Sequence, residues 1–130
     1  MRPNHAVTVF IAVSLLVWSG CGSSGRPHAA ATVPVKGTVT YKGKPLSGGE
    51  ITFEPGFGRE AFGTIQSDGT FVLTTFKEGD GAVAGTHRVA VTGTAAGGRQ
   101  ATPLKYKNTS SSKIQVEVSE GKTDYSIDLQ

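Results

Sequence analysis

Beyond residue 33 the chain alternates between apolar and polar side chains with a period of two, which is typical of β-strands that face a core on one side. The clearest example places Val116 between Gln115 and Glu117, and Ile127 between Ser126 and Asp128 repeats the pattern. This alternation predicts seven short strands, at residues 35–41, 51–54, 62–66, 71–73, 88–92, 114–118 and 125–129.

Turn signals rich in Gly, Pro, Asp and Ser separate these segments, at residues 42–45, 47–49, 67–69, 78–81 and 119–122. No stretch in this part of the chain repeats its apolar residues with the period of a helix. The pattern therefore predicts an all-β fold, an antiparallel seven-stranded β-sandwich in which two sheets share one core. Periodicity alone leaves immunoglobulin-like, fibronectin-like and transthyretin-like topologies open.

The first residues have the pattern of an export signal. Arg2 precedes an apolar run over residues 6–18 that only Thr8 and Ser14 interrupt. A membrane-spanning helix needs about 20 apolar residues, so this shorter run fits a cleavable signal peptide better. We expect residues 1–20 to be this signal peptide.

The sole cysteine, Cys21, directly follows the small residues Ser19 and Gly20 at the end of the apolar run. This arrangement resembles a bacterial lipobox, although Trp18 stands where that motif usually has Leu. The resemblance implies that the Cys21 thiol receives a diacylglycerol, and that Cys21 then becomes the first residue of a lipoprotein carrying acyl chains such as palmitate. The alternative is an ordinary signal peptide whose cysteine is lost or left as a free thiol.

Residues 22–32 consist of Gly, Ser, Ala and Thr, interrupted only by Arg26, Pro27 and His28. Such a segment cannot bury a core, so residues 21–33 are predicted to form a flexible tether. The folded domain is then expected to occupy residues 34–130.

The composition narrows the set of partners. Thirteen Lys and Arg against ten Asp and Glu give a net charge of +3, with 18% charged residues. This charge is too small for a nucleic-acid binder, which would concentrate basic residues on one face. A single cysteine excludes an internal disulfide and a cysteine-based zinc site.

Three segments of the domain resemble carboxypeptidase regulatory-like domains: residues 35–46 resemble their opening hairpin, 63–73 their central hairpin and 84–91 the next strand. The resemblance implies a transthyretin-like (prealbumin-like) sandwich. Residues 103–106 and 112–118 look like a pattern of short bacterial lipoproteins of uncharacterised function that carry this domain. In metallocarboxypeptidases the zinc and catalytic residues belong to a separate domain, so the resemblance implies no activity for the sandwich alone.

Candidate catalytic and metal-binding residues are sparse. His28 lies in the predicted tether, and His87 by itself, interpreted as a partly buried strand residue, supplies neither a triad nor a zinc site. Glu78 and Asp80 share one loop, but calcium prefers six to eight oxygen ligands. We therefore expect no metal and no cofactor, and any hydrolase activity would depend on carboxylates.

The loop aromatics are the remaining candidates for ligand binding. Phe57 and Arg59 lie in one glycine-rich loop, and Tyr106 lies beside Lys105 and Lys107 in another. The aromatic rings either cap the ends of the core or take part in a small recognition patch. That patch would consist of Phe57, Arg59 and Tyr106.

The sequence thus favours a non-enzymatic lipoprotein, anchored to the inner or outer membrane of a bacterial cell envelope with its domain facing the periplasm or the exterior. It would act as a structural or interaction module toward an envelope protein or a glycan. The alternatives are a glycan- or peptide-binding lipoprotein that uses the loop aromatics and a small carboxylate-based hydrolase.

Overall fold

The computed structural model describes residues 31–130. The expected signal peptide, the expected lipidation site at Cys21 and most of the expected tether lie outside these residues. The described chain forms the strands β1 (Thr32–Val33), β2 (Lys36–Tyr41), β3 (Lys44–Pro45), β4 (Gly49–Pro55), β5 (Ala61–Ile65), β6 (Thr70–Val72), β7 (Ala82–Val83), β8 (Gly85–Gly93), β9 (Ile114–Val118) and β10 (Asp124–Leu129), and the short helices η1 (Leu104–Lys107) and α1 (Thr109–Ser112).

The all-β prediction is confirmed, and each of the seven predicted segments overlaps one strand: β2, β4, β5, β6, β8, β9 and β10. The sequence pattern missed β1, β3 and β7, because a strand of two residues is too short to show an alternation. It also missed the two short helices between β8 and β9.

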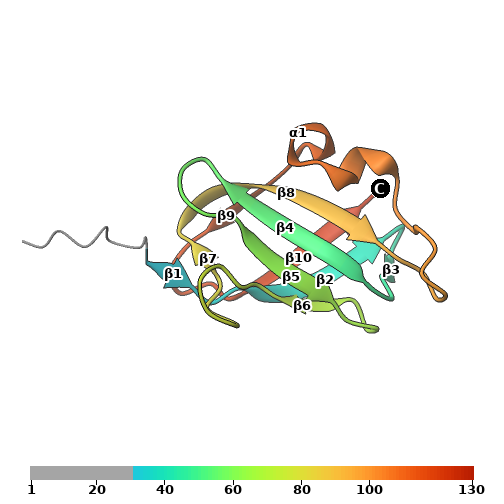
Figure 1. Cartoon of the computed structure of the whole chain (residues 1–130), viewed down its shortest axis with the longest axis horizontal. Coiled ribbons are helices and arrows are strands. Elements are labelled where there is room, and N and C mark those ends of the chain that lie inside the picture. Colours follow the sequence, from blue (N-terminus) through green and yellow to red (C-terminus); the bar gives the residue numbers. More distant parts are fainter. Residues whose placement is uncertain (1–30) are drawn as a thin grey trace, which may run out of the picture.

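The strands form two four-stranded sheets and one short pair (Figure 1). One large sheet has the order β5-β4-β8-β9, and all of its neighbours are antiparallel. In the other, β2 pairs with β10 on one side and with β3 and β6 on the other. The short pair joins β1 to β7.

One pair departs from the expected antiparallel arrangement. β10 runs parallel to β2, with Asp124 opposite Lys36 and Leu129 opposite Tyr41. The reason is that β9 and β10, although consecutive, belong to different sheets, so the turn between them crosses from one sheet to the other. In this position Tyr125, Ile127 and Leu129 all point into the core.

A single hydrophobic cluster contains buried residues from both large sheets. Phe53 of β4 packs on Phe71 of β6 across it, with ring centroids 6.2 Å apart and planes tilted by 49°. Close backbone approach also matters, because a Cβ atom on Gly37 of β2 would lie 1.9 Å from the carbonyl oxygen of Tyr125. The two strands can therefore pair in this register only around a glycine.

The last two residues of the expected tether form β1, in which Thr32 and Val33 are strand residues and the Val33 side chain is buried. They pair with Val83 and Ala82 of β7. Gly81, just before β7, has a φ of +91°, and a Cβ atom there would lie 1.8 Å from the Val33 carbonyl oxygen. The chain is therefore fixed to the domain from Thr32 onward.

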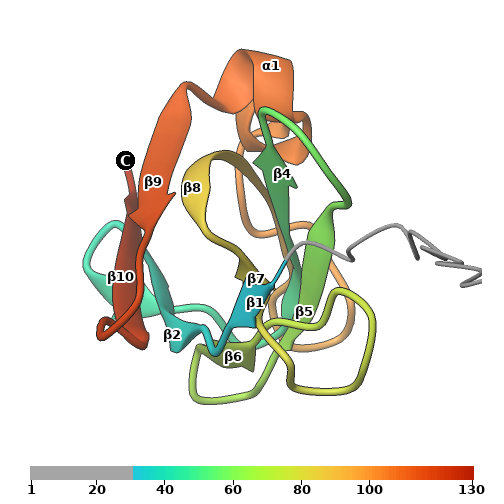
Figure 2. The same cartoon turned by 90° about the vertical axis from the view of Figure 1, so that its left-hand side faces the viewer.

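The two short helices cover one edge of the molecule above β8 and β4 (Figure 2). Buried Ser112 of α1 donates a hydrogen bond to the carbonyl oxygen of Val89 in β8. In η1 the Tyr106 hydroxyl donates to the Gln130 carbonyl oxygen at 3.0 Å, which fastens the C terminus. Neither helix, nor any other among residues 31–130, is long and apolar enough to cross a membrane.

Candidate functional site

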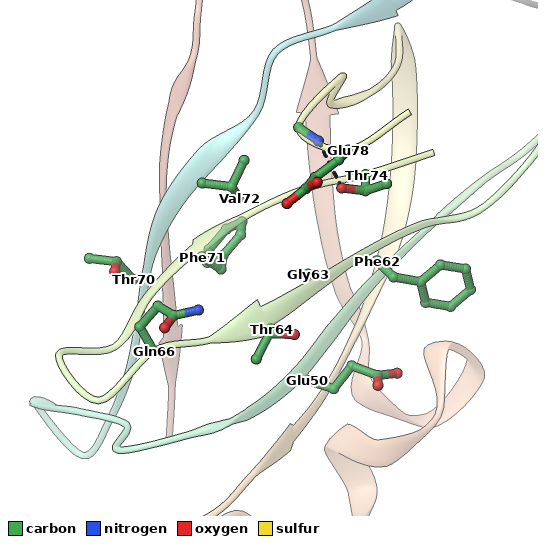
Figure 3. A pocket seen from close by; sticks show the side chains of 11 residues that line it. Glu50, Phe62, Gly63, Thr64, Gln66, Thr70, Phe71, Val72, Thr74 and Glu78 are labelled. Carbon is green, nitrogen blue, oxygen red and sulfur yellow. Dashed lines mark hydrogen bonds between the residues drawn. The ribbon is translucent and has the colours of Figure 1, made fainter. Parts of the chain in front are cut away.

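A groove of about 560 Å³ lies over β5 and β6 (Figure 3). Its lining consists of Glu50, Phe62, Gly63, Thr64, Gln66, Thr70, Phe71, Val72, Thr74, Glu78 and Gly79. We call this feature the β5–β6 groove. Phe71 and Gly63 are buried beneath it, whereas most of the other lining residues are exposed to solvent.

The groove follows from the local geometry of the hairpin that contains β5 and β6. Asp68 and Gly69 make the turn, and the Asp68 carboxylate accepts hydrogen bonds from the backbone N–H and the hydroxyl of Thr70 at 3.0 and 2.6 Å. Both hydrogen bonds lower the pKa of the Asp68 carboxyl, and the bond from the Thr70 hydroxyl has the larger effect. Away from the turn, β5 and the chain after β6 are joined by paired hydrogen bonds between Phe62 and Thr74.

Between its two bonded ends the hairpin diverges, because β5 pairs with β4 and β6 pairs with β2 in the other sheet. At Gly63 the two strands are still close, because an added Cβ atom would be 2.8 Å from the Val72 carbonyl oxygen. The strand period turns Phe62 and Thr64 outward, while Ala61 and Ile65 point into the core. The groove therefore lies on the outer surface, where the two sheets meet.

The lining chemistry is that of a surface for a neutral polar ligand. It offers three threonine hydroxyls, the Gln66 amide and two carboxylates, together with the apolar side chains of Phe62 and Val72, which are 45% and 55% exposed. Among these lining residues there is no Lys, Arg or His. Such a surface suits hydroxyl groups and apolar C–H faces rather than phosphates or carboxylates.

The loop between β6 and β7 forms one rim of the groove and is fixed by Asp80. The Asp80 carboxylate accepts hydrogen bonds from the backbone N–H groups of residues 75–77, at 2.7, 3.0 and 3.0 Å. Partial burial raises the pKa of this carboxyl, but the three backbone N–H donors lower it by more than that. The pKa of Asp80 therefore lies below the ordinary value for aspartate. At the rim, the N–H of Gly79 donates to the Thr74 hydroxyl at 2.9 Å.

Both carboxylate oxygens of Asp80 thus accept hydrogen bonds within its own loop. Asp80 is one of the two carboxylates of the candidate calcium loop, so only Glu78 remains free to bind a cation there. Across residues 31–130 there is no group of three or more His, Cys, Asp or Glu side chains placed to hold a metal ion. The carboxylates that do reach the groove are Glu50 and Glu78, both exposed.

The three residues of the predicted recognition patch do not come together. Phe57 is 95% exposed, and the Arg59 guanidinium carbon lies 5.8 Å from the ring centroid of Phe76. Tyr106 is buried in η1. Helix η1 follows Thr102, whose hydroxyl accepts a hydrogen bond from the N–H of Gly93 at the end of β8. The loop that contains Phe57 follows Pro55, and Pro55 lies opposite His87 near the start of β8. The Tyr106 ring therefore caps the core, while Phe57 and Arg59 lie at the opposite end of β8.

His87 is fully buried in β8, deeper than the partly buried position expected from the sequence. Its ring lies 5.7 Å from the Phe53 ring, and Nε2 is 2.6 Å from the Val83 carbonyl oxygen. Nδ1 has no hydrogen-bond partner. Enclosed in this way, His87 is a core residue and does not reach the groove.

Sequence reasoning missed the groove, although part of its signal was present. Phe62 and Val72 lie at the positions of their strands that face away from the core, where an apolar side chain points to solvent. Comparisons with known protein families, characterised proteins and solved structures gave no match to this chain. The groove must therefore be interpreted from its own residues.

Proposed function

We propose that this protein is a non-enzymatic, lipid-anchored interaction module of the bacterial cell envelope, and that its β5–β6 groove binds a neutral glycan. The anchor would be formed at Cys21, and the domain would face the periplasm or the exterior. The single observation that carries the binding function is the hydroxyl-rich groove with the half-exposed Phe62 ring and no cationic side chain in its lining.

The proposal includes a transthyretin-like, seven-stranded sandwich, as the resemblance to carboxypeptidase regulatory-like domains implies. It is supported by the two four-stranded sheets and by the one hydrophobic cluster to which both contribute. In this interpretation β1, β3 and β7 are short additions to the seven longer strands. The short β1–β7 pair extends the same core, because Val33 and Ala82 belong to the hydrophobic cluster.

A sugar fits the groove chemically because its two kinds of surface are both matched. Its C–H face packs on an aromatic ring, and its hydroxyls exchange hydrogen bonds with hydroxyl, amide and carboxylate groups. Phe62 supplies the ring, while Thr64 of β5, Gln66 just after β5 and Thr70 of β6 lie along the groove (Figure 3). A carboxylate such as Glu50 accepts strong hydrogen bonds from sugar hydroxyls without any need for a counter-ion.

The glycan function is tested by titrating the purified protein with neutral cello-, malto- and chito-oligosaccharides in a calorimeter. Phe62→Ala is expected to abolish binding. Phe76→Ala is the matched control, because Phe76 is 46% exposed and lies outside the groove lining. Equal affinity in the two variants, or no heat with any of these sugars, would contradict the proposal.

The same samples separate a binding module from a hydrolase. Glu50 and Glu78 lie on opposite sides of the groove in Figure 3, and both are open to solvent. A catalytic acid usually needs a shielded site that raises its pKa. We expect chromatography of the incubated sugars to find no shortened product; shortened sugars that disappear in Glu50→Gln would favour the hydrolase instead.

The anchor is tested separately by growing cells with radiolabelled palmitate. The wild-type protein is expected to carry the label and Cys21→Ser to lack it, because a thioether can form only at the thiol. Label that persists in Cys21→Ser would refute acylation at this position.

A further inference from the structure

Two exposed phenylalanines outside the groove lining lie at the end of the domain where the chain enters it. Phe57 in the loop between β4 and β5 is 95% exposed, and Phe76 in the loop between β6 and β7 is 46% exposed. The Arg59 guanidinium carbon, 5.8 Å from the centroid of the Phe76 ring, links the two loops. We call these two loops, residues 56–60 and 73–81, the aromatic tip.

β1 lies at this same end. A Cβ atom on Gly58 would be 3.9 Å from a side-chain methyl of Val83, and Val83 is paired with Thr32 of β1. Gly81 at the end of the second loop lies against the Val33 backbone. Figure 1 shows β1 and the loop that follows β4 together at one end of the molecule, with the C terminus at the other.

We infer that the aromatic tip rests in the interface of the membrane that holds the protein, with Phe57 inserted between lipid headgroups; this inference rests on the proposed lipid anchor at Cys21. Ten residues separate Cys21 from Thr32. As an unfolded chain they would span roughly 18 Å, which keeps the tip close to the bilayer surface at a high effective concentration. A weak insertion is then sufficient to orient the domain.

The charges of the tip indicate which force would act. Arg59 and Lys77 stand against Glu60, Glu78 and Asp80, so the tip has a net charge of −1 and carries no positive excess toward anionic lipids. An exposed phenylalanine ring gains free energy by leaving water for the boundary between headgroups and acyl chains. We therefore expect insertion to be the same in neutral and anionic bilayers.

The opposite end provides a matched control. Leu104 in η1 is 66% exposed. It follows Thr102, which is bonded to Gly93, the last residue of β8. The nine residues of β8 span about 26 Å from the end near β7 to this point. Leu104 should therefore remain in water when Phe57 is in the interface.

The test uses the full-length protein, processed by the cell, purified from membranes and reconstituted into phosphatidylcholine vesicles, with or without brominated acyl chains. Phe57→Trp and Leu104→Trp are compared, and the wild type supplies any background from Trp18, the only native tryptophan. A ring 5–10 Å deep lies within reach of the bromines, so Trp at position 57 is expected to lose about half of its emission. Trp at position 104 should be unaffected.

The outcomes separate this inference from the anchor. A mass spectrum of the wild type that lacks acyl chains overturns both. Acylated protein in which neither tryptophan is quenched, or in which both are quenched equally, overturns the insertion of the tip and leaves the anchor standing. Quenching that requires added phosphatidylglycerol overturns apolar insertion, because charge would then hold the domain on the bilayer.

Discussion

Gly81 couples the chain that enters the domain to the rest of the fold, so Gly81→Ala should separate β1 from β7. The backbone at this position has a φ of +91°, and the new Cβ atom would lie 1.8 Å from the Val33 carbonyl oxygen. No rotation of a methyl group relieves a contact with a backbone atom. The strand must therefore move away, and Val33 loses its burial.

The magnitude can be worked out from two contributions. An alanine at a positive φ costs about 1 kcal/mol, and exposing the buried Val33 side chain costs about 1.5 kcal/mol more. Gly79→Ala isolates the first contribution, since Gly79 has a φ of +73° in the same loop and an added Cβ atom would have no neighbour within 4 Å. We expect losses of about 2.5 and about 1 kcal/mol in the free energy of unfolding.

Urea denaturation of the full-length protein, followed by circular dichroism, measures both losses. For a domain of this size a difference of about 1.5 kcal/mol moves the midpoint by about 1 M. Hydrogen exchange adds a local measurement. The amides of β1 and β7 should exchange faster in Gly81→Ala than in the wild type, and at the wild-type rate in Gly79→Ala. Equal losses of stability in the two variants would refute the contact with Val33 as the reason for the glycine.

Three further predictions concern contacts elsewhere in the fold. Asp80→Asn removes the charge that accepts three backbone N–H bonds, so it should lower the free energy of unfolding by about 2 kcal/mol at pH 7. Because the pKa of Asp80 is lowered in the folded protein, the wild type should lose this extra stability as the pH falls below about 4. The unfolding curves of the two proteins should therefore converge at low pH. Gly37→Ala places a Cβ atom 1.9 Å from the Tyr125 carbonyl oxygen, so amide exchange in β10 should accelerate throughout the strand, and protection equal to the wild type would contradict the parallel pairing. Ser112→Ala deprives the Val89 carbonyl oxygen of a buried donor and should lower stability by about 1 kcal/mol, whereas exposed Ser110→Ala should leave the denaturation midpoint unchanged.

The alternation in the sequence located strands such as β5 and β10 because each has one buried and one exposed face. β8 is buried on both faces at residues 89–91, and there only its first residues alternate. β10 is the simplest case, with Tyr125, Ile127 and Leu129 buried and the residues between them exposed. The same pattern does not specify which strand is the neighbour of which. The parallel pairing of β10 with β2 depends on a turn that crosses between sheets, and that turn contains the same Gly and polar residues as a hairpin.

The candidate site was harder to predict because its residues gather from three parts of the chain. Glu50 comes from β4, Phe62 from β5 and Val72 from β6, and only the divergence of β5 from β6 leaves space above them. Tyr106 was a candidate because Lys105 and Lys107 suggested an exposed loop. A single turn of helix instead directs its ring inward and its hydroxyl to Gln130.

The parallel pair of β2 and β10 also has a consequence for the order of events in folding. Every residue of β10 lies opposite a partner 88 positions earlier in the chain. Contacts of such long sequence separation form late and slowly, since a large loop must close before they contribute any stability. β10 is the partner of β2 along that edge, so a chain lacking residues 124–129 leaves Val39 and the rest of this β2 edge unpaired.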